Sequence, residues 1–463
     1  MDAGNLYKPD PKSDPTYFAG INEHLVAQVR PDDRVILDVG CANGRLGEKL
    51  KSLRLDRIVY GIERIGPAAD QARVVLDAVF QSDVTRDIPP IEAGTLDCII
   101  FGDVLEHIYD PVGVLVRLKP LLRPSGRFLC SIPNFQHFSA LSSLVAGDFQ
   151  YQQNGLLDRD HLRFFGVANV QKMFLDAGCL PRFPDAIRIP IAPEVLAAYT
   201  PLLAHLKLNV QAFADKASIY QHICTAEPLP DISLGSESIT FISPVTDIRS
   251  LQDNLMASPL IRSGRHEFIP VCGATSASDT LRLGLANSRS DCRMVVLVQP
   301  DVYLPSGWDD RLLMGVKAAE AHYGAVGVAG VLGVTSLAAS RFERAGRTLR
   351  RSKAIATAHA LPIQAVSLDE MVLAFPRTAG ILQQIPADLG FHMYGSAACM
   401  EADDAGLAAV IIDAPCLHNT EASEALDAAF VQAAQCFARN WYTRLPYATT
   451  LVEFKSNGQI AYW

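Results

Sequence analysis

The chain has 463 residues, of which 49% are hydrophobic, and a formal net charge of −9. This length predicts two domains rather than a single core. The acidic balance argues against a nucleic-acid-binding protein, which needs a basic face. The ten cysteines form no Cys-x-x-Cys pair. We therefore expect neither a zinc site nor a disulfide framework built from cysteines, and the reducing cytoplasm is the expected compartment.

Two stretches bear on membrane targeting. Residues 1–18 are polar and contain prolines, unlike a secretory signal. The most apolar stretch, Tyr323–Ser340, is long enough to span a membrane, but its recurrent glycines favour a buried strand and turns. We expect no transmembrane segment, and contact with a membrane only at its surface or through a partner.

In chain order, the first half alternates between helical and extended patterns. A helix is predicted over 21–30, a strand over 35–39 and a helix over 45–53. Further strands are predicted over 57–63, 78–84, 96–108 (which runs into a loop), 126–134, 186–192 and 217–228, with helices over 67–79, 111–122 and 194–206. This alternation predicts an α/β fold with a parallel, Rossmann-like sheet and right-handed crossovers.

A linker is predicted over 230–237, where Pro, Gly, Ser and Asp cluster without apolar periodicity. It separates an expected domain over 1–229 from a second over 238–463. In the second half the alternation restarts, with strands predicted over 238–245, 266–273 and 293–305 and helices over 250–258 and 309–324. A second α/β domain is the simplest interpretation.

The stretch VILDVGCANG, residues 35–44, predicts a strand that ends in a glycine-rich turn before a helix. Small residues let a ligand approach the backbone, and the helix N-terminus offers unpaired N–H groups. Ala42 occupies the middle glycine position of the dinucleotide fingerprint, and the last glycine comes too early. The turn therefore favours a nucleoside without a pyrophosphate over NAD.

Four motifs resemble a known family. The string D-x-G-C-x-x-G at 38–44 resembles motif I of class I S-adenosylmethionine (SAM)-dependent methyltransferases. GDVLEHIYDP at 102–111, SIPN at 131–134 and DRDHLRFFG at 158–166 resemble methyltransferases of the ubiquinone-biosynthesis type and their relatives in sugar methylation. The resemblance covers about 30–228. It implies that SAM is held by Asp38, Gly40, Cys41, Gly44, Glu63, Asp83, Val84 and Asp103.

The acids in this set follow four successive predicted strands, which is where ligands bind in an open parallel sheet. Glu63 is expected to accept the ribose hydroxyls and Asp83 the adenine amine of the cofactor. A hydroxyl acceptor of the methyl group gains from a base. His161 is the main candidate for that base and His107 the second, with a role in fixing the loop as the alternative for His107.

The second half, about 238–446, resembles a bacterial glycosyltransferase-like family with the GT-A nucleotide-sugar fold, through NLMASPLI, VQPDVYLPSGWDDRLL, LDEMVLAF, LGFHMYG and VIIDAPCLHN. The resemblance implies that Asp301 and His418 hold Mg²⁺ or Mn²⁺ with the diphosphate of a nucleotide sugar. Many such enzymes present two acids where this chain has Asp301 alone.

At the position where relatives place a catalytic acid, after FHMYG, the chain has Ser396, Ala397 and Ala398. Either Glu401, Asp403 or Asp404 takes over as the base, or the base is missing. The second half is then either an active transferase or a relic that only binds glycan.

Three hypotheses follow. The first is a bifunctional protein of polysaccharide biosynthesis that O-methylates a sugar of a cell-surface glycan or its lipid-linked precursor. The second has the same methyltransferase with a second half that only binds glycan. The third is a methyltransferase for a quinone-like small molecule with an unrelated appendage. The aromatic residues Phe135, Phe138, Phe149 and Tyr151 suit a sugar or a quinone ring, or a place in the core.

Overall fold

The computed structural model describes residues 20–147, 149–206, 208–231, 237–289, 292–336, 343–350, 353–357, 359–419 and 427–462. The chain divides into two compact units, Met1–Leu229 and Pro230–Trp463, called here the first and second unit. Residues 232–236 of the expected linker and 337–340 of the apolar stretch lie outside the described residues.

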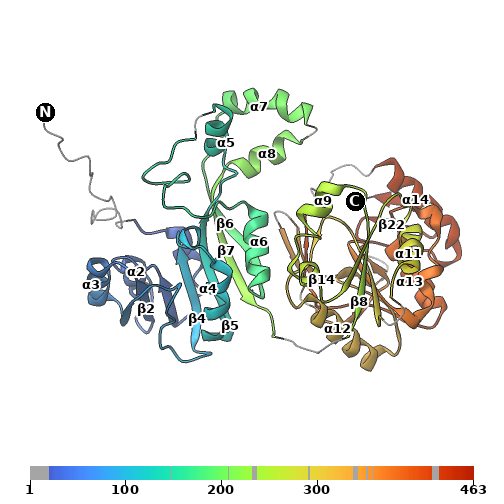
Figure 1. Cartoon of the computed structure of the whole chain (residues 1–463), viewed down its shortest axis with the longest axis horizontal. Coiled ribbons are helices and arrows are strands. Elements are labelled where there is room, and N and C mark those ends of the chain that lie inside the picture. The colour runs from blue at the N-terminus through green and yellow to red at the C-terminus, as the bar shows by residue number, and fades with distance from the viewer. Residues whose placement is uncertain are drawn as a thin grey trace. The chain divides into compact units, whose positions relative to one another are not determined.

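The first unit contains a seven-stranded sheet in the order β3-β2-β1-β4-β5-β7-β6 (Figure 1). Its strands are β1 (Val35–Val39), β2 (Ile58–Glu63), β3 (Ala78–Gln81), β4 (Leu96–Gly102), β5 (Leu122–Pro133), β6 (Cys179–Arg188) and β7 (Ile219–Pro228). The first five strands are parallel, as predicted, and β7 runs antiparallel to both β5 and β6. The strand order reverses between β1 and β4, so their carboxyl ends form the crevice in which such sheets bind ligands.

The helices of the first unit are α1 (Glu23–Gln28), α2 (Arg45–Leu53), α3 (Gly66–Val75), α4 (Pro111–Leu118), α5 (Phe138–Val145), α6 (Val167–Asp176), α7 (Pro193–His205) and α8 (Val210–Ala217), with 3-10 turns η2 (Leu105–His107) and η3 (Lys119–Leu121). Local signals set several of their ends. Asp110 accepts the Gly113 N–H at 3.0 Å and caps α4, whose first residue is Pro111. The sequence patterns did not predict α5, α6 or α8.

The strand expected over 186–192 is β6 in the structure. It spans Cys179–Arg188 and overlaps the expected range only at 186–188. Gly178 turns the chain just before β6 with a left-handed φ of 70°, and the first two strand residues, Cys179 and Leu180, are buried.

An ion pair is buried in the core of the first unit. The Arg127 guanidinium contacts both oxygens of Asp33 at 2.9 and 2.8 Å, with both side chains at most 2% exposed.

The second unit is also α/β, with a mixed seven-stranded sheet in the order β16-β19-β12-β18-β10-β8-β9. These strands are β8 (Ile239–Pro244), β9 (Glu267–Val271), β10 (Met294–Val298), β12 (Val326–Gly330), β16 (Ile363–Gln364), β18 (Val372–Pro376) and β19 (Ala408–Ile411). Strands β8, β9 and β10 are parallel, and β18 runs antiparallel between β10 and β12. This architecture agrees with the α/β prediction, while the GT-A assignment stays a prediction.

A second sheet contains β11 (Val302–Tyr303), β13 (Leu332–Ser336), β14 (Glu343–Arg350), β15 (Lys353–Ala356), β17 (Ser367–Leu368) and β20 (Leu417–His418). A third contains β21 (Tyr447–Ala448), β22 (Val452–Phe454) and β23 (Ile460–Tyr462). The helices are α9 (Ile248–Asp253), α10 (Pro259–Arg262), α11 (Ala277–Ala286), α12 (Trp308–Tyr323), α13 (Tyr394–Asp404) and α14 (Ala428–Asn440). Across the described residues, no helix combines the length and the apolar character needed to cross a bilayer.

Candidate active site

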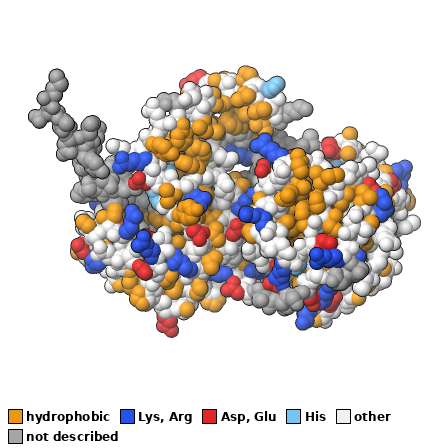
Figure 2. Space-filling model, in the orientation of Figure 1, with side chains coloured by type: hydrophobic (Ala, Val, Ile, Leu, Met, Phe, Trp, Pro, Cys, Tyr) orange, Lys and Arg blue, Asp and Glu red, His pale blue; other side chains and the backbone are white. Residues whose placement is uncertain are grey.

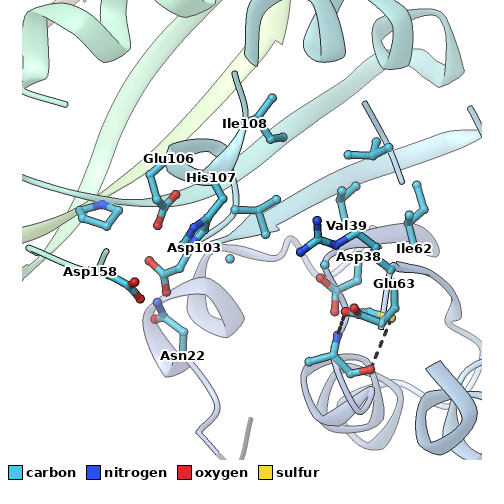
Figure 3. A pocket seen from close by; sticks show the side chains of 18 of the residues that line it. Asn22, Asp38, Val39, Ile62, Glu63, Asp103, Glu106, His107, Ile108 and Asp158 are labelled. Carbon is cyan, nitrogen blue, oxygen red and sulfur yellow. Dashed lines mark hydrogen bonds between the residues drawn. The ribbon is translucent and has the colours of Figure 1, made fainter. Parts of the chain in front are cut away.

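A cavity of about 1080 Å³ opens at the carboxyl ends of β1, β2 and β4 in the first unit (Figure 3). The predicted residues that line it are Asp38, Gly40, Cys41, Glu63, Asp83, Val84, Asp103, His107 and His161. Asp38 and Glu63 lie on one side of the cavity, and Glu106, His107 and Asp158 lie on the other. Gly44 is not part of this lining and instead forms the N-cap of α2.

The glycine turn after β1 needs the left-handed backbone that the sequence pattern implied. Gly40 and Gly44 have φ angles of 72° and 83°. A β-carbon on Gly40 would lie 2.6 Å from Val104 Cγ2, so a larger residue does not fit there. Ala42 also adopts a left-handed φ of 47°, at a cost of about 1 kcal/mol. The methyl group of Ala42 therefore leaves the turn intact.

Glu63 fastens the end of β2 to this turn. One carboxylate oxygen accepts the Ala42 N–H at 2.9 Å, and the other accepts the Ile65 N–H at 2.7 Å. Glu63 is 7% exposed. Each carboxylate oxygen has further lone pairs, so the group can hold the turn and still accept ligand hydroxyls.

Asp38 has an unusual acidity. Burial raises its pKa from 3.8 to about 7, and the neighbouring negative charge of Glu63 adds to the rise. The pKa of Asp83 is lowered, because the Thr85 hydroxyl donates to it at 2.7 Å. Asp103 follows β4 with a left-handed φ of 54° and accepts a hydrogen bond from Gln221 at 2.7 Å. Burial also raises the pKa of Asp103, to about 6, so the cavity contains two weakened acids and one strengthened acid.

On the other side of the cavity, two segments distant in sequence are joined. The carbonyl of Glu106 accepts the backbone N–H groups of Leu162 and Arg163 at 2.8 and 3.0 Å. The rings of His107 and His161 consequently lie 4.9 Å apart, edge to face. One ligand atom from each of Glu106, His107 and His161 lies within 4.8 Å of the others, so the three could hold a metal ion. The sequence analysis missed Glu106, although it directly precedes His107.

Aromatic side chains extend from this group to the surface. The ring of His161 lies 6.4 Å from that of Phe164, which lies 4.7 Å from Phe135 and 6.3 Å from Phe149. Tyr151 continues the cluster at 5.3 Å from Phe149. Exposed apolar residues gather over the neighbouring helices α5 and α7 (Figure 2), including Leu144, Val145 and Leu202. The cavity itself is lined by acids and histidines together with apolar side chains such as Leu25, Ile62 and Ile108.

The second unit has a smaller cavity of about 270 Å³, lined by residues that include Asp247, Gln299, Asp301 and Tyr394. His418 pairs with Val302 across β11 and β20, which brings His418 Nε2 to 3.3 Å from Asp301 Oδ2. The two predicted metal ligands therefore lie together. A metal role for this pair stays a prediction.

The acids proposed as a substitute base do not line this second cavity. Asp403 and Asp404 pair with Arg444, and Ala397 and Ala398 are fully buried in α13. A different acid, Glu370, lies close to the start of α13. It receives the Gly395 N–H at 3.4 Å, and its pKa is raised well above the usual value, by burial first and then by Asp369. The sequence analysis did not single out Glu370.

Comparison with known proteins concerns the part of the chain that contains the larger cavity. Residues 16–180 match a family described as "Methyltransferase domain". This part of the chain is a class I SAM-dependent methyltransferase domain. The match contains β1 to β5 and therefore most of the larger cavity.

Relatives of the methyltransferase domain include two ubiquinone biosynthesis O-methyltransferases. The one from Psychrobacter arcticus is 30% identical over 169 residues, covering 35% of this chain and 65% of its own length. The one from Paraburkholderia xenovorans is 26% identical, covering 48% of this chain and 90% of its own length. The chain thus spans just under two thirds of the first of these curated relatives.

Two solved structures are similar to the chain at low identity. A SAM-dependent methyltransferase from Archaeoglobus fulgidus shows 14% identity and a TM-score of 0.33, covering 46% of this chain and 96% of the other. The plantazolicin methyltransferase BpumL, solved in complex with S-adenosylhomocysteine (SAH), shows 15% identity and a TM-score of 0.31, covering 44% and 80%.

Proposed function

We propose that the protein transfers the methyl group of SAM to a hydroxyl group of an acceptor. The main support is that the motif I turn, the acids at the strand ends and the pair His107–His161 all border one cavity of the methyltransferase domain. The crevice beyond the carboxyl ends of parallel strands is where such sheets bind ligands.

In this proposal each cofactor group meets a matching acceptor. Asp38 receives the methionyl ammonium, Glu63 the ribose hydroxyls and Asp83 the adenine amine, with the turn at 40–44 against the nucleoside. All three cofactor groups are hydrogen-bond donors, which suits carboxylates. Cys41, Val84 and Asp103 complete the proposed cofactor contacts.

The chemical step needs alignment more than activation, because the leaving group is already a sulfonium ion. An oxygen lone pair of the acceptor forms the new O–CH₃ bond. The S–CH₃ bond breaks, and its electrons stay on sulfur in SAH. The hydroxyl proton passes to His161, with His107 as the second candidate base.

For the acceptor we propose a sugar of a cell-surface glycan or of its lipid-linked precursor. The exposed apolar residues on α5 and α7 would suit a lipid-linked molecule or a membrane surface, and the rings of Phe149 and Tyr151 would stack on a sugar. In this proposal the protein is cytoplasmic, meets a membrane only peripherally through its acceptor, and has no nucleic-acid partner.

A quinone-like acceptor is the second candidate. It is favoured by the relatives, which are named as ubiquinone biosynthesis O-methyltransferases. The same aromatic rings would stack on a quinone-like ring.

For the second unit we propose nucleotide-sugar binding with Mg²⁺ or Mn²⁺ at Asp301 and His418, supported by their 3.3 Å approach beside a cavity. A glycan-binding module without transferase activity is the alternative. Titration of the full chain with nucleotide sugars, with and without Mn²⁺, separates the two.

The test of the proposed function uses the full chain and SAM carrying a labelled methyl group. Parallel incubations contain cell-envelope glycan fractions and a catechol with a short prenyl chain. Label in a glycan fraction supports the sugar acceptor, and label in the catechol supports the quinone-like acceptor. Label in neither, under conditions where SAH binds, would overturn both.

A further inference from the structure

We propose that Gln221 is a positioning residue for the cofactor, because its side chain holds the Asp103 carboxylate in the orientation that receives SAM. Gln221 Nε2 donates to Asp103 Oδ1 at 2.7 Å, and both residues line the cavity of the methyltransferase domain. Gln221 lies on β7, outside residues 16–180 that match the family. This role of Gln221 rests on the proposed placement of SAM in the cavity.

The sheet brings Gln221 to Asp103 from two strands away. Gly102, at the end of β4, pairs with Ser131 of β5, and Pro133 of β5 pairs with Gln221 of β7. The side chain of Gln221 therefore reaches past the end of β5 to the residue that follows β4. An asparagine is shorter by one C–C bond, about 1.5 Å, so the length of glutamine suits this span.

The backbone beside Gln221 is anchored by Asn134, the last residue of the SIPN motif. The buried Asn134 side chain donates to the Ile219 carbonyl at 2.7 Å, and its backbone N–H donates to the Tyr220 carbonyl at 2.9 Å. Strand β7 also pairs with β5 on one side and β6 on the other. The amide donor is thus carried by an interior strand, which fixes a functional group more precisely than a loop does.

Asp103 needs such a partner because its backbone is strained. Its left-handed φ of 54° costs a residue other than glycine about 1 kcal/mol. Strain of this kind gathers at binding and catalytic sites, where surrounding contacts maintain it. The Asp103 N–H donates to the Ser131 carbonyl at 3.3 Å, and the Gln221 amide holds the side chain. The carboxylate is thereby oriented before the cofactor binds, which lowers the cost of binding.

The amide of Gln221 also suits an ionised Asp103. The amide nitrogen only donates, and an ionised carboxylate only accepts. The oxygens of the carboxylate have lone pairs for several donors, so Asp103 can accept from Gln221 and from the cofactor at once. Loss of the amide would remove a bond that stabilises the negative charge and would let the carboxylate turn away from the cofactor.

The first test is calorimetry with SAH on the full chain carrying Gln221→Leu, which is similar in size to glutamine but cannot donate. We expect SAH affinity to fall about three- to tenfold, as for the loss of one hydrogen bond. Gln211→Leu is the matched control, because Gln211 donates to Asp215 at 2.9 Å on the exposed surface of α8, away from the residues that line the cavity. This control should bind SAH normally.

Gln221→Glu distinguishes positioning from a merely structural role. Glutamic acid has nearly the shape of glutamine, and its protonated form can donate to Asp103, whereas its ionised form repels Asp103. We therefore expect the SAH affinity of this variant to match the wild type at pH 5.5 and to fall below it at pH 8.5. The ratio to the wild type at each pH removes the effect of the acids and histidines that both proteins share. A ratio that does not change with pH would contradict the positioning role.

A double-mutant cycle tests whether Gln221 acts through Asp103. Asp103→Gly removes the carboxylate and suits the left-handed backbone. In this background Gln221→Leu should change SAH affinity by less than about twofold. A loss as large as that in the wild-type background would overturn the inference.

Thermal unfolding reports whether each variant is folded. Wild-type SAH affinity in a folded Gln221→Leu variant would overturn the role of Gln221 and leave the proposed function standing. An absence of SAH binding by the wild-type chain would overturn the proposed function and the role of Gln221 together.

Discussion

The carboxylate of Glu63 accepts the backbone N–H of Ala42 at 2.9 Å and so ties the end of β2 to the turn after β1. The same residue is proposed to hold the ribose of SAM. If Glu63 also holds the ribose as proposed, turn geometry and cofactor affinity are coupled through one side chain.

We predict that Glu63→Gln weakens SAH binding by about 1.5–3 kcal/mol, because charge-assisted hydrogen bonds to the ribose are lost. Calorimetry with SAH measures the change. Glu48→Gln, at an exposed position of α2, is the matched control and should bind SAH normally. Equal affinities for the two variants would remove Glu63 from the cofactor site.

SAH affinity should rise with pH and level off above about 7. The pKa of Asp38 is raised to about 7, so Asp38 is protonated at lower pH and must lose that proton to receive the ammonium group. Calorimetric titrations with SAH between pH 5.5 and 8.5 test this. Because one proton is released, the affinity for SAH should change by at most about tenfold per pH unit. In Asp38→Asn, the part of the pH dependence of SAH affinity that Asp38 causes should vanish.

The same shift affects stability without ligand, with a defined sign. The folded pKa of Asp38 lies above its ordinary value of 3.8, so the folded state holds the proton more tightly. The contribution of Asp38 to the free energy of unfolding is therefore fully present below about pH 4 and is lost as the pH rises through about 7. The difference in melting temperature between the wild type and Asp38→Asn, measured from about pH 4 to 7, isolates the contribution of Asp38. A difference in melting temperature that stays constant over this pH range would contradict the raised pKa of Asp38.

Gly44→Ala should destabilise the methyltransferase domain more than Gly94→Ala. Both glycines have left-handed φ angles, of 83° and 73°. A β-carbon at 44 would lie 2.7 Å from Val75 Cγ2, while nothing lies within 4 Å at 94. In both variants the alanine side chain costs about 1 kcal/mol or more because the backbone is left-handed, and Gly44→Ala adds the steric clash. Thermal unfolding of the two variants gives the comparison, and equal melting temperatures would refute the clash.

Removing one partner of the buried pair Asp33–Arg127 should cost about 3–5 kcal/mol, because the other charge stays buried. Urea unfolding of Asp33→Ala measures this cost. The exposed pair Arg249–Asp253, at 3.6 Å, provides the control, and Asp253→Ala should cost at most about 1 kcal/mol. Similar losses for both variants would show that the Asp33–Arg127 pair is not buried in solution.

The parts of the fold that follow local patterns could be predicted from the sequence. Strand β1 and helix α2 have the predicted bounds, because the apolar run and the glycines that limit them are adjacent in the chain. The acids at the strand ends converge because a parallel sheet gathers its carboxyl ends at one edge.

Other features depend on contacts between distant segments. Glu106 joins His161 only because the segment at 158–163 bonds to the loop after β4. Likewise, the antiparallel insertion of β18 beside β10 depends on sheet pairing that no local pattern specifies. Glu370 meets the start of α13 through a hydrogen bond to Gly395, which is 25 residues away in the chain, so no local pattern reveals this contact either.

Calorimetric titration of the full chain with SAH tests cofactor binding without any assumption about the acceptor. We expect saturable binding of one SAH per chain, weakened in Asp38→Asn and unaffected in His418→Ala. An absence of binding heat at several temperatures, with the chain folded, would contradict it.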